Sequence, residues 1–492
     1  MIQATGAPKD IVIVGSGIGG LTAGIILAKL NHRVTVAEKN HLPGGLMRSY
    51  TRDGIDCPVG VHYMGSLGDG QPLRRLWDYL GVTPLIPLER MGSEGVIDRY
   101  VFDDFAFDLP EGIDAFEENL RFSFPGDSTT IASVIRDLRH TSQMLSSLDI
   151  LASPQMTFLS PESFGSMGEH LKRMGCSTPL INVLGVPSTL IGVPLQECPA
   201  FYYHMTLASY LLSSWRLACK SSQMADAFVT RLKSLGGGVL TGDGVEKILI
   251  EREKVKGVML QSGRTLKATV VIAAVHPGTV AAMLPEDALR ATHAERISQL
   301  VNTKGLFGVN LAVDADTHAA LPYNIYQLYA EDGVLTRGIF HQLRRSGQEG
   351  INLLSMITTS RIEDWDEWTW TASGRRNQSY VSAKEDKARY FIGEATKLFG
   401  NLKGSKILDI YTPLTIRDWV GSPDGSAYGI LRSTRQIMKT AFLKRTLIDG
   451  LFLAGQSSLA PGIMGTMLGS FQTVRNIIGH ERFAREVMGA FL

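Results

Sequence analysis

The sequence predicts an α/β fold in which two domains interleave along the chain. A strand, a glycine-rich turn, a helix and a second strand follow one another over residues 10–38. Short strands recur between residues 239 and 274, and a strand, a glycine turn and a helix occupy residues 451–478. The long segments between these three parts lose the alternation of strand and helix, so we expect them to form a separate domain of mixed sheet and helix.

The first unit begins with the apolar, β-branched run Ile11–Val14, which is typical of a buried parallel strand. The run ends at glycines with the spacing G-x-G-x-x-G. Gly15 permits a tight turn, Gly17 lets the backbone approach a pyrophosphate, and Gly20 lets helix and strand pack closely. The second strand ends in Glu38, where an acidic side chain can bond a ribose hydroxyl. We therefore predict a Rossmann-type dinucleotide site that disfavours NADP and leaves FAD and NAD both open.

Composition and charge narrow the range of partners. The 492 residues include 49 basic and 48 acidic side chains, so the overall field is too weak to recruit nucleic acid. The four cysteines contain no closely spaced pair, so we expect no metal site and no disulfide framework, and a reducing cytoplasm fits best. No signal peptide is recognisable before the first strand. The glycine-rich uncharged stretches 11–28 and 450–474 are not expected to span a membrane.

Two short glycine motifs follow the first unit. Residues 43–47, Pro-Gly-Gly-Leu-Met, form a turn that exposes its backbone and suits a flat or anionic ligand, although Gly-Gly alone favours a plain connecting loop. Residues 60–65, Gly-Val-His-Tyr-Met-Gly, place the polar aromatic side chains of His62 and Tyr63 between glycines. A single histidine is most often structural, so the spacing alone gives neither side chain a role.

Together these motifs resemble the phytoene desaturase, carotenoid isomerase and retinol saturase group, FAD flavoproteins that act on conjugated polyene lipids. The resemblance rests on residues 15–20, Glu38, 43–45 and 60–65, and it extends over nearly the whole chain. It implies FAD as the cofactor and a Rossmann-type FAD-binding domain of the glutathione-reductase and amine-oxidase kind. It also implies that the Gly-x-His-Tyr segment runs beside the flavin, which makes its histidine and tyrosine catalytic candidates.

The resemblance further implies which residues hold the cofactor. In the family, the residue that matches Val245 contacts the adenine through its backbone. The implied cofactor-binding residues are Gly15, Ser16, Gly17, Ile18, Gly19, Gly20, Glu38, Lys39, Gly44, Gly45, Leu46, Met47, His62, Val245, Gly455, Gln456, Gly462, Ile463 and Met464.

The second domain shows its own secondary-structure pattern. Residues 101–108 alternate loosely and predict a strand pair, and residues 128–149 predict an amphipathic helix. Further along the chain, residues 306–313 and 351–358 predict strands, and residues 384–399 predict a helix. This combination indicates an α+β domain.

Residues 174–215 form a long stretch with one formal charge, at Glu197. Its prolines exclude a single long helix, and it contains many aromatic residues at helical spacing. So long an uncharged stretch exceeds what an enclosed core needs. Three interpretations remain open: core packing, the lining of an apolar tunnel, and a patch that rests on a membrane to collect lipid.

The alternation of strand and helix resumes after the uncharged stretch. Residues 224–235 predict an amphipathic helix that ends at three glycines, a C-cap signal. Short strands are then expected at residues 239–241, 245–251, 255–261 and 265–274. In the resembling family, a β-meander of this kind packs on the nucleotide domain.

A segment at residues 411–430 recurs in the resembling group. From its own residues it is a turn-rich loop with large aromatic side chains and one charge pair, Arg417 and Asp418. Adjacent residues of an extended segment point to opposite sides, so the two charges need not act together. Both are catalytic candidates, although we prefer structural ion pairs with other partners.

The last unit is a strand at residues 451–456 that runs into a glycine turn, followed by a glycine-rich helix at Gly462–Ile478. A helix N-terminus directed at the pyrimidine side of a flavin stabilises the reduced anion. Many FAD relatives have an acid after the turn glycine, Gly455, whereas this chain has Gln456. Retinol saturases resemble the chain in this Gly-Gln pair.

These segments predict two discontinuous domains. The FAD-binding domain comprises residues 1–80, 221–290 and 440–492, and the substrate-binding domain comprises residues 81–220 and 291–439. A second G-x-G-x-x-G that opens a helix after a strand is absent from the sequence. We therefore expect no separate NAD(P)H domain of the disulfide-reductase type.

The predicted function is that of an FAD-dependent oxidoreductase acting on carbon–carbon double bonds of a long apolar polyene or isoprenoid. Desaturation, saturation and cis-trans isomerisation all remain open. Hydride chemistry at a flavin needs mainly orientation and exclusion of water, which agrees with the lack of a recognisable acid–base set. The alternatives are an amine-oxidase-like flavoenzyme acting on a polar substrate and a non-catalytic flavoprotein that carries lipid. The expected location is the cytoplasm, with membrane contact and oligomeric state left open.

Overall fold

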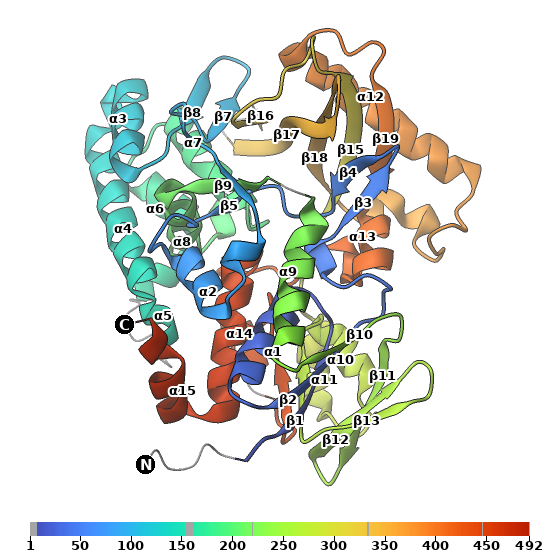
Figure 1. Cartoon of the computed structure of the whole chain (residues 1–492). Coiled ribbons are helices and arrows are strands. Elements are labelled where there is room, and N and C mark those ends of the chain that lie inside the picture. The colour runs from blue at the N-terminus through green and yellow to red at the C-terminus, as the bar shows by residue number, and fades with distance from the viewer. Residues whose placement is uncertain (1–6, 153–160, 219, 332–333, 445, 492) are drawn as a thin grey trace.

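The computed structural model describes residues 7–152, 161–218, 220–331, 334–444 and 446–491. Two sheets dominate the molecule (Figure 1). A parallel sheet lies in the lower half together with helices from near both ends of the chain, and a large sheet lies at the upper right. A group of helices forms the left-hand side. Segments from both ends of the chain therefore meet in the lower half.

The parallel sheet has the arrangement that the first unit predicts. Its strands, in spatial order, are β10 (Gly238–Leu240), β2 (Arg33–Ala37), β1 (Asp10–Val14), β14 (Val270–Ala273) and β20 (Leu451–Leu453). The apolar residues of β1 are each at most 3% exposed, as expected for a central strand. Helix α1 (Ile18–Lys29) packs against α9 (Ser221–Ser234) and α14 (Gly462–Ile478). The predicted α/β class with a Rossmann-type domain is confirmed.

A three-stranded antiparallel meander lies beside this sheet and consists of β11 (Val245–Glu251), β12 (Lys254–Leu260) and β13 (Thr265–Lys267). The prediction of one strand at residues 265–274 is wrong, because the segment changes partners halfway. The Ala268 N–H donates to the Lys256 carbonyl in the meander, whereas the Thr269 N–H donates to the Asp10 carbonyl in the parallel sheet. The strand expected just before the meander joins the parallel sheet as β10.

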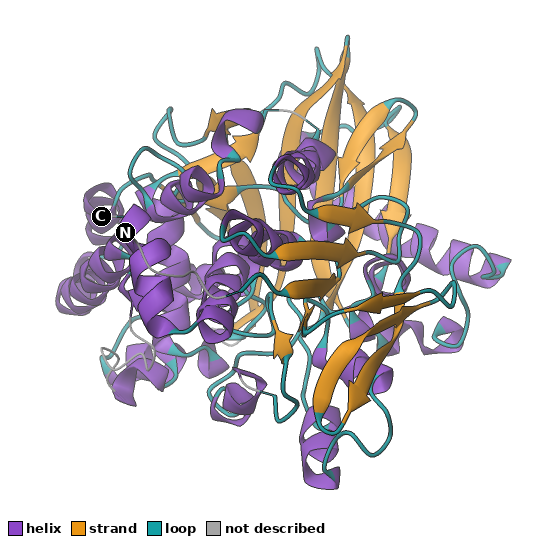
Figure 2. Ribbon diagram, turned by 60° about the horizontal axis from the view of Figure 1, so that its bottom comes forward, coloured by secondary structure: helices purple, strands orange, loops and turns teal. Residues whose placement is uncertain are grey.

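The large sheet has seven strands and a mixed topology. Their order is β19 (Lys406–Tyr411), β15 (Gly305–Asp314), β18 (Ile351–Ser360), β17 (Val334–Gln348), β16 (Asn324–Glu331), β7 (Asp98–Val101) and β8 (Ala106–Leu109). Adjacent strands are antiparallel except β16 and β7, which are parallel. Figure 2 shows the long strands of this sheet standing beside the shorter strands of the lower half. Helix α12 (Gln378–Phe399) packs on the large sheet through a second hydrophobic core.

The structure contains the predicted strand pair as β7 and β8, and the two later strands as β15 and β18. Helix α12 begins at Gln378, before the predicted start, because Asn377 caps it by accepting the Tyr380 N–H. Strands β16 and β17 were not predicted. They bury polar side chains, among them Gln327, His341 and Gln342, and these interrupt the apolar alternation that identifies a strand.

Two small sheets and several helices complete the described chain. The small sheets pair β3 (Ser49–Arg52) with β4 (Ile55–Pro58), and β9 (Ser214–Leu217) with β5 (Met64–Gly65) and β6 (Leu88–Arg90). The other helices are α2 (Pro72–Leu80), α3 (Ile113–Ser123), α4 (Ser128–Ser147), α5 (Asp149–Ala152), α6 (Met167–Arg173), α7 (Thr178–Thr189), α8 (Ala200–Leu212), α10 (Pro277–Met283), α11 (Ala291–Ser298), α13 (Pro413–Val420) and α15 (His480–Glu486). Helix α4 matches the helix predicted at residues 128–149.

The uncharged stretch 174–215 forms α7 and α8 and enters β9. Pro187 lies inside α7 without ending it, and the chain bends between the two helices instead. Tyr203 and Leu207 of α8 are 0% and 1% exposed, so this part of the stretch packs the main hydrophobic core. Tyr210, near the end of α8, keeps part of its surface accessible.

The chain passes repeatedly between the parallel sheet and the seven-stranded large sheet. The parallel sheet takes its strands from three regions of the sequence, and the seven-stranded sheet takes its strands from the intervening regions. The limits of the two discontinuous domains stay a prediction.

The contact between α1 and the first strand yields a test of stability. A Cβ atom on Gly20 would lie 2.1 Å from the Gly15 carbonyl oxygen. We expect Gly20→Ala to lower the free energy of unfolding by about 3 kcal/mol, the upper end of the cost of overpacking. The matched control is Gly393→Ala in α12, where a Cβ would meet no atom within 4 Å and alanine should stabilise by about 1 kcal/mol. Equal melting temperatures of the two variants would contradict this.

Candidate dinucleotide and active site

The glycine turn after β1 is shaped by close contacts on two sides. Gly15 has φ +94°, and its N–H donates to the Ala37 carbonyl of β2 at 2.9 Å. A Cβ on Gly19 would lie 2.5 Å from the Cα of Gly455, so the turn after β20 presses directly on the start of α1. A Cβ on Gly17, by contrast, would meet no atom within 4 Å. Free space thus opens at the N-terminus of α1, which has no side-chain cap.

Glu38 connects this turn to the end of β2. Its carboxylate is buried and accepts four hydrogen bonds: at Oε2 from Ser16 N (3.0 Å) and Ser16 Oγ (2.6 Å), and at Oε1 from Asn40 N and Asn40 Nδ2 (both 2.9 Å). The Ser16 hydroxyl in turn accepts the Gly44 N–H at 3.0 Å. Sequence reasoning missed Asn40, although an asparagine two residues after an acid is a common turn signal. The carboxylate is therefore fixed at the carboxyl ends of β1 and β2.

The Pro-Gly-Gly turn lies over the glycine turn. Gly44 and Gly45 both have positive φ, and a Cβ on Gly45 would lie 3.1 Å from the Cα of Gly17. The Leu46 side chain contacts the second glycine motif, residues 60–65, by filling the space beside Gly60. Met47 is buried behind the turn. The two glycine motifs thus pack closely against each other.

Lys39 lies close to Val245, another of the predicted cofactor-binding residues. A Cβ on Gly244 would lie 2.8 Å from the Lys39 Cβ, which places Lys39 directly beside the start of β11. Partial burial lowers the pKa of Lys39, and its ammonium donates to the Asp418 carbonyl at 3.4 Å. The end of α13 therefore borders the same region.

The C-terminal turn supplies a second uncapped helix start. Gly455 and Gly462 have φ +86° and +76°, and α14 begins at Gly462 without a side-chain cap. Behind this turn, the buried guanidinium of Arg432 donates to the carbonyls of Gln456 (3.3 Å) and Ser457 (2.5 Å). Tyr202 OH donates to the Leu459 carbonyl at 2.8 Å. The loop before Gly462, Ile463 and Met464 is thus held by two side chains, Arg432 and Tyr202.

His62 and Tyr63 are held by a closed ring of buried hydrogen bonds from the large sheet. Tyr63 OH donates to Asp98 Oδ2 at 2.9 Å, and Asn324 Nδ2 donates to Asp98 Oδ1 at 2.8 Å. Gln342 Nε2 donates both to Asn324 Oδ1 at 3.0 Å and to the His62 carbonyl at 3.2 Å. No sequence pattern distinguishes Asp98, Asn324 or Gln342, because single polar residues within strands usually face solvent.

Aromatic side chains from two other parts of the chain pack against this motif. The Phe340 ring lies 5.5 Å from His62, and the Tyr210 ring lies 4.8 Å from Tyr63. Burial lowers the pKa of His62 to about 4 and raises the pKa of Tyr428 to about 12. His62, Tyr210, Phe340 and Tyr428 nevertheless keep accessible surface. We call these four incompletely covered side chains the aromatic chamber.

Arg417 and Asp418 lie in a helix, so the expectation of a turn-rich loop is wrong for this part. Thr412 caps α13 through a capping box, a signal that the two threonines at residues 412 and 415 carried. Arg417 Nε pairs with Asp418 Oδ1 at 2.9 Å, and Asp418 also pairs with Arg376. Arg417 donates further to the Thr371 carbonyl at 2.9 Å. These contacts tie α13 to the loop before α12, and a catalytic role for either residue stays a prediction.

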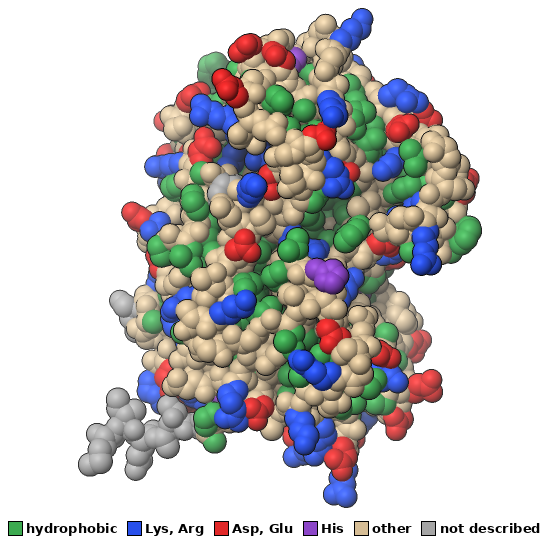
Figure 3. Space-filling view, turned by 45° about the vertical axis from the view of Figure 1, so that its right-hand side comes forward, with side chains coloured by type: hydrophobic (Ala, Val, Ile, Leu, Met, Phe, Trp, Pro, Cys, Tyr) green, Lys and Arg blue, Asp and Glu red, His purple; other side chains and the backbone are tan. Residues whose placement is uncertain are grey.

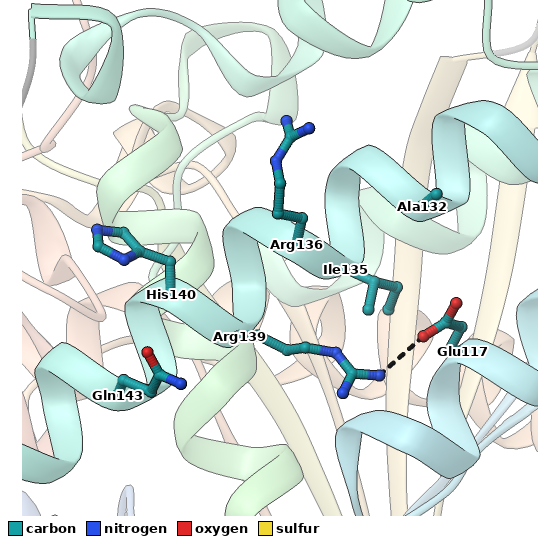
Figure 4. Close-up of a pocket in the computed structure, with 7 residues that line it drawn as sticks. All are labelled: Glu117, Ala132, Ile135, Arg136, Arg139, His140 and Gln143. Atoms are coloured by element: carbon teal, nitrogen blue, oxygen red, sulfur yellow. Dashed lines mark hydrogen bonds and ion pairs between the residues drawn. The ribbon is translucent and has the colours of Figure 1, made fainter.

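A separate surface pocket of about 380 Å³ lies between α3 and α4. Figure 4 shows Arg139 of α4 reaching across to Glu117 of α3, while Arg136 and His140 point outward. Its charges are paired and none of the glycine motifs borders it, so we assign it no part in the site. Within the described ranges, no group of three or more His, Cys, Asp or Glu side chains gathers as metal ligands would.

Comparison with known proteins places this geometry among flavoprotein-type folds. Residues 13–80 match the family model of an NAD(P)-binding Rossmann-like domain. The solved structure of putrescine oxidase bound to putrescine aligns with a TM-score of 0.64 at 15% identity, over 97% of this chain and 100% of that one. The predicted glutathione-reductase and amine-oxidase kind of fold agrees with this match.

Sequence similarity extends along nearly the whole chain. All-trans-retinol 13,14-reductase of Danio rerio is 23% identical over 528 residues, which cover 95% of this chain and 86% of the relative. Prolycopene isomerase of Daucus carota is 23% identical over 483 residues, which cover 91% and 76%. A second Danio rerio relative, 22% identical over 521 residues, is named an inactive all-trans-retinol 13,14-reductase. The predicted resemblance is confirmed: the chain is a retinol saturase- and carotenoid desaturase-like oxidoreductase.

Proposed function

We propose that this chain is an FAD-dependent oxidoreductase that acts on carbon–carbon double bonds of a long apolar polyene. The observation that carries the proposal is the similarity over more than nine tenths of the chain to relatives named for retinol reduction and prolycopene isomerisation. The neutral aromatic chamber beside the Gly-x-His-Tyr segment supports it. Saturation, desaturation and isomerisation of a polyene double bond all require an apolar binding site.

The dinucleotide site fits FAD in its residue types and in its free space. The N-termini of α1 and α14 both lack side-chain caps, and a Cβ on Gly17 or Gly462 would meet no atom within 4 Å. Such helix starts offer free N–H groups and positive dipole ends to an anion. In this proposal Glu38 holds the ribose, Val245 borders the adenine, and the start of α14 faces the flavin. The flavin supplies the hydride chemistry when it is bound.

The chamber residues exclude water and orient the substrate in this proposal. With its pKa near 4, His62 is a neutral imidazole at pH 7, and burial keeps the phenols of Tyr210 and Tyr428 protonated. A chamber wall without charge favours a polyene over the ammonium group of an amine substrate. We therefore rank the amine-oxidase-like alternative below polyene chemistry and keep it, with the lipid carrier, as an outcome of the tests below.

Membrane contact is a second part of the proposal. No helix in the described part of the chain combines the length and apolar character needed to cross a bilayer. Large apolar side chains are nevertheless exposed near the dinucleotide site: Trp370 (83%), Leu42 (63%) and Trp419 (55%). Arg48 joins two of these segments by donating to the carbonyls of Leu42 and Trp419. Figure 3 shows a face on which hydrophobic side chains lie at mid-height among lysines and arginines.

Flavin binding tests the cofactor. Glu38→Ala removes the ribose partner, so we expect FAD affinity to fall by about 10–100-fold, the cost of about 1–3 kcal/mol for unpaired polar groups. Gly17→Ala should also weaken FAD binding, since its new methyl group enters the free space, while the apoprotein melts as the wild type does. The matched control is Glu246→Ala on the exposed side of β11. Full flavin retention by Glu38→Ala would count against this site.

Turnover tests the reaction. Dithionite-reduced holoenzyme should be reoxidised by all-trans-retinol or prolycopene, or should isomerise the polyene, with products identified by chromatography. Polyene binding without any change in flavin spectrum or product would favour the lipid carrier. Reduction of the flavin by an amine, but no reaction with any polyene, would favour the amine-oxidase-like alternative.

Vesicle binding tests the membrane contact. Replacing Trp370 and Trp419 together with serine should reduce co-sedimentation with phosphatidylcholine vesicles several-fold, because interfacial tryptophans are lost. Phe122→Ser on α3 is the control, since Phe122 is 91% exposed but lies on a different element. Equal losses for both variants, or no vesicle binding by the wild type, would refute the contact.

A further inference from the structure

Asp98, at the start of β7, is a deeply buried acid that the proposed function does not yet use. It is 1% exposed, and its Oδ2 accepts the Tyr63 hydroxyl at 2.9 Å. The same Tyr63 oxygen lies 2.8 Å from the hydroxyl of Tyr326 on β16. Asp98, Tyr63 and Tyr326 therefore form an unbroken chain of three oxygen atoms, which we call the oxygen chain.

The oxygen chain satisfies its hydrogen bonds in two protonation states. When Asp98 is ionised, Tyr63 donates to it and Tyr326 donates to Tyr63. When Asp98 is protonated, it donates to Tyr63, and Tyr63 donates to Tyr326. Since hydroxyl groups both donate and accept, the heavy atoms need not move between these states. The chain can thus hold or release one proton without rearrangement.

The surroundings of Asp98 bring the pKa of its carboxyl group close to physiological pH. Burial raises the pKa of Asp98 to about 7, against the hydrogen bonds from Asn324 and Tyr63 and the positive charge of Arg216, which lower it. The other titratable groups that face it are the phenols of Tyr100, Tyr210 and Tyr326. These phenols stay protonated because burial raises their pKa values. Asp98 is therefore the member of this group that titrates near neutral pH.

The middle of the oxygen chain borders the aromatic chamber. The Tyr63 ring packs against Tyr210 at 4.8 Å and stacks on Phe340 at 6.1 Å, and both of these side chains belong to the chamber. Tyr63 also belongs to the motif whose His62 carbonyl is fixed by Gln342. A proton on Tyr63 is thus held at a defined position in the chamber wall.

We propose that Asp98, acting through Tyr63, exchanges a proton with the polyene bound in the aromatic chamber. This inference rests on the proposed function and makes Asp98 a positioning and proton-holding residue. In saturation, one carbon of the double bond takes a hydride, for which reduced flavin is the donor class. The neighbouring carbon takes the Tyr63 proton: the O–H bond breaks as the C–H bond forms. The Asp98 proton moves to the Tyr63 oxygen, leaving a carboxylate, and desaturation follows the same path in reverse.

The pH dependence of stability tests the acid without any substrate. A carboxyl group whose pKa is raised on folding contributes stability below its unfolded value of about 3.8, and this is lost as pH rises through about 7. Asp98→Asn keeps an acceptor for Asn324 but cannot titrate. We expect its melting temperature, relative to wild type, to rise between pH 4 and pH 7. A flat difference would overturn the assignment.

Tyr63→Phe gives an independent measurement if Asp98→Asn does not fold. It removes a hydrogen bond that lowers the pKa of Asp98, so the inflection in stability should move to higher pH. Tyr100→Phe is the matched control, because Tyr100 packs edge-on against Tyr326 at 5.7 Å but is outside the oxygen chain. An unchanged inflection in Tyr63→Phe, or the same shift in the control, would refute the coupling.

Turnover then tests the proton transfer itself. With dithionite-reduced holoenzyme and all-trans-retinol in D₂O, the saturated product should gain two deuterium atoms per double bond: one from the reduced flavin, whose transferable N–H exchanges with solvent, and one from the Tyr63 hydroxyl. Asp98→Asn and Tyr63→Phe should lower kcat at least tenfold with little change in KM, and Asp98→Asn should lose the inflection near pH 7. Tyr100→Phe should keep wild-type kcat. Wild-type kcat and pH profile in Asp98→Asn would overturn the proposal, whereas a wild type inert toward every polyene would refute the proposed function instead.

Discussion

The whole dinucleotide site depends on a contact that leaves no room for side chains. The start of α1 touches the Gly15 carbonyl through Gly20 and the backbone of Gly455 through Gly19. Because both contacts are backbone to backbone, they bring the carboxyl ends of β1 and β20 within reach of one ligand. They also align the uncapped N-termini of α1 and α14, which come from opposite ends of the chain.

The two halves of the candidate site differ in charge and polarity. On the Rossmann side, two helix N-termini without side-chain caps present positive partial charge, and the buried Glu38 carboxylate is held by four hydrogen bonds. On the side of the large sheet, polar groups are turned inward to one another, and the surface left for substrate is aromatic and neutral. His62 and Tyr63 lie at the border: their backbone belongs to the glycine motifs, while their hydrogen-bond partners come from the large sheet.

The sequence predicted what depends on local pattern and missed what depends on long-range pairing. The β1–α1–β2 unit, Glu38 and α14 were recognisable because glycine spacing and apolar runs are local signals. The strand at residues 265–274 was misjudged because its break is a change of partner strand, which leaves no mark on apolar periodicity. Asp98 was not predicted for a similar reason: its hydrogen-bond partners, Tyr63 and Asn324, are distant in the sequence. Helix α13 was missed although its capping threonines were visible.

The order of strands in the parallel sheet has a consequence for synthesis of the protein. Strand β14 is complete at Ala273, but its neighbour β20 begins only at Leu451, about 180 residues later. At 5–20 residues per second, a ribosome needs roughly 10–35 s to cover that interval. During that time the open edge of the Val270–Ala273 strand has no native partner, and α14 has not yet been made. This edge of the nascent chain therefore stays unpaired until Leu451–Leu453 has been translated.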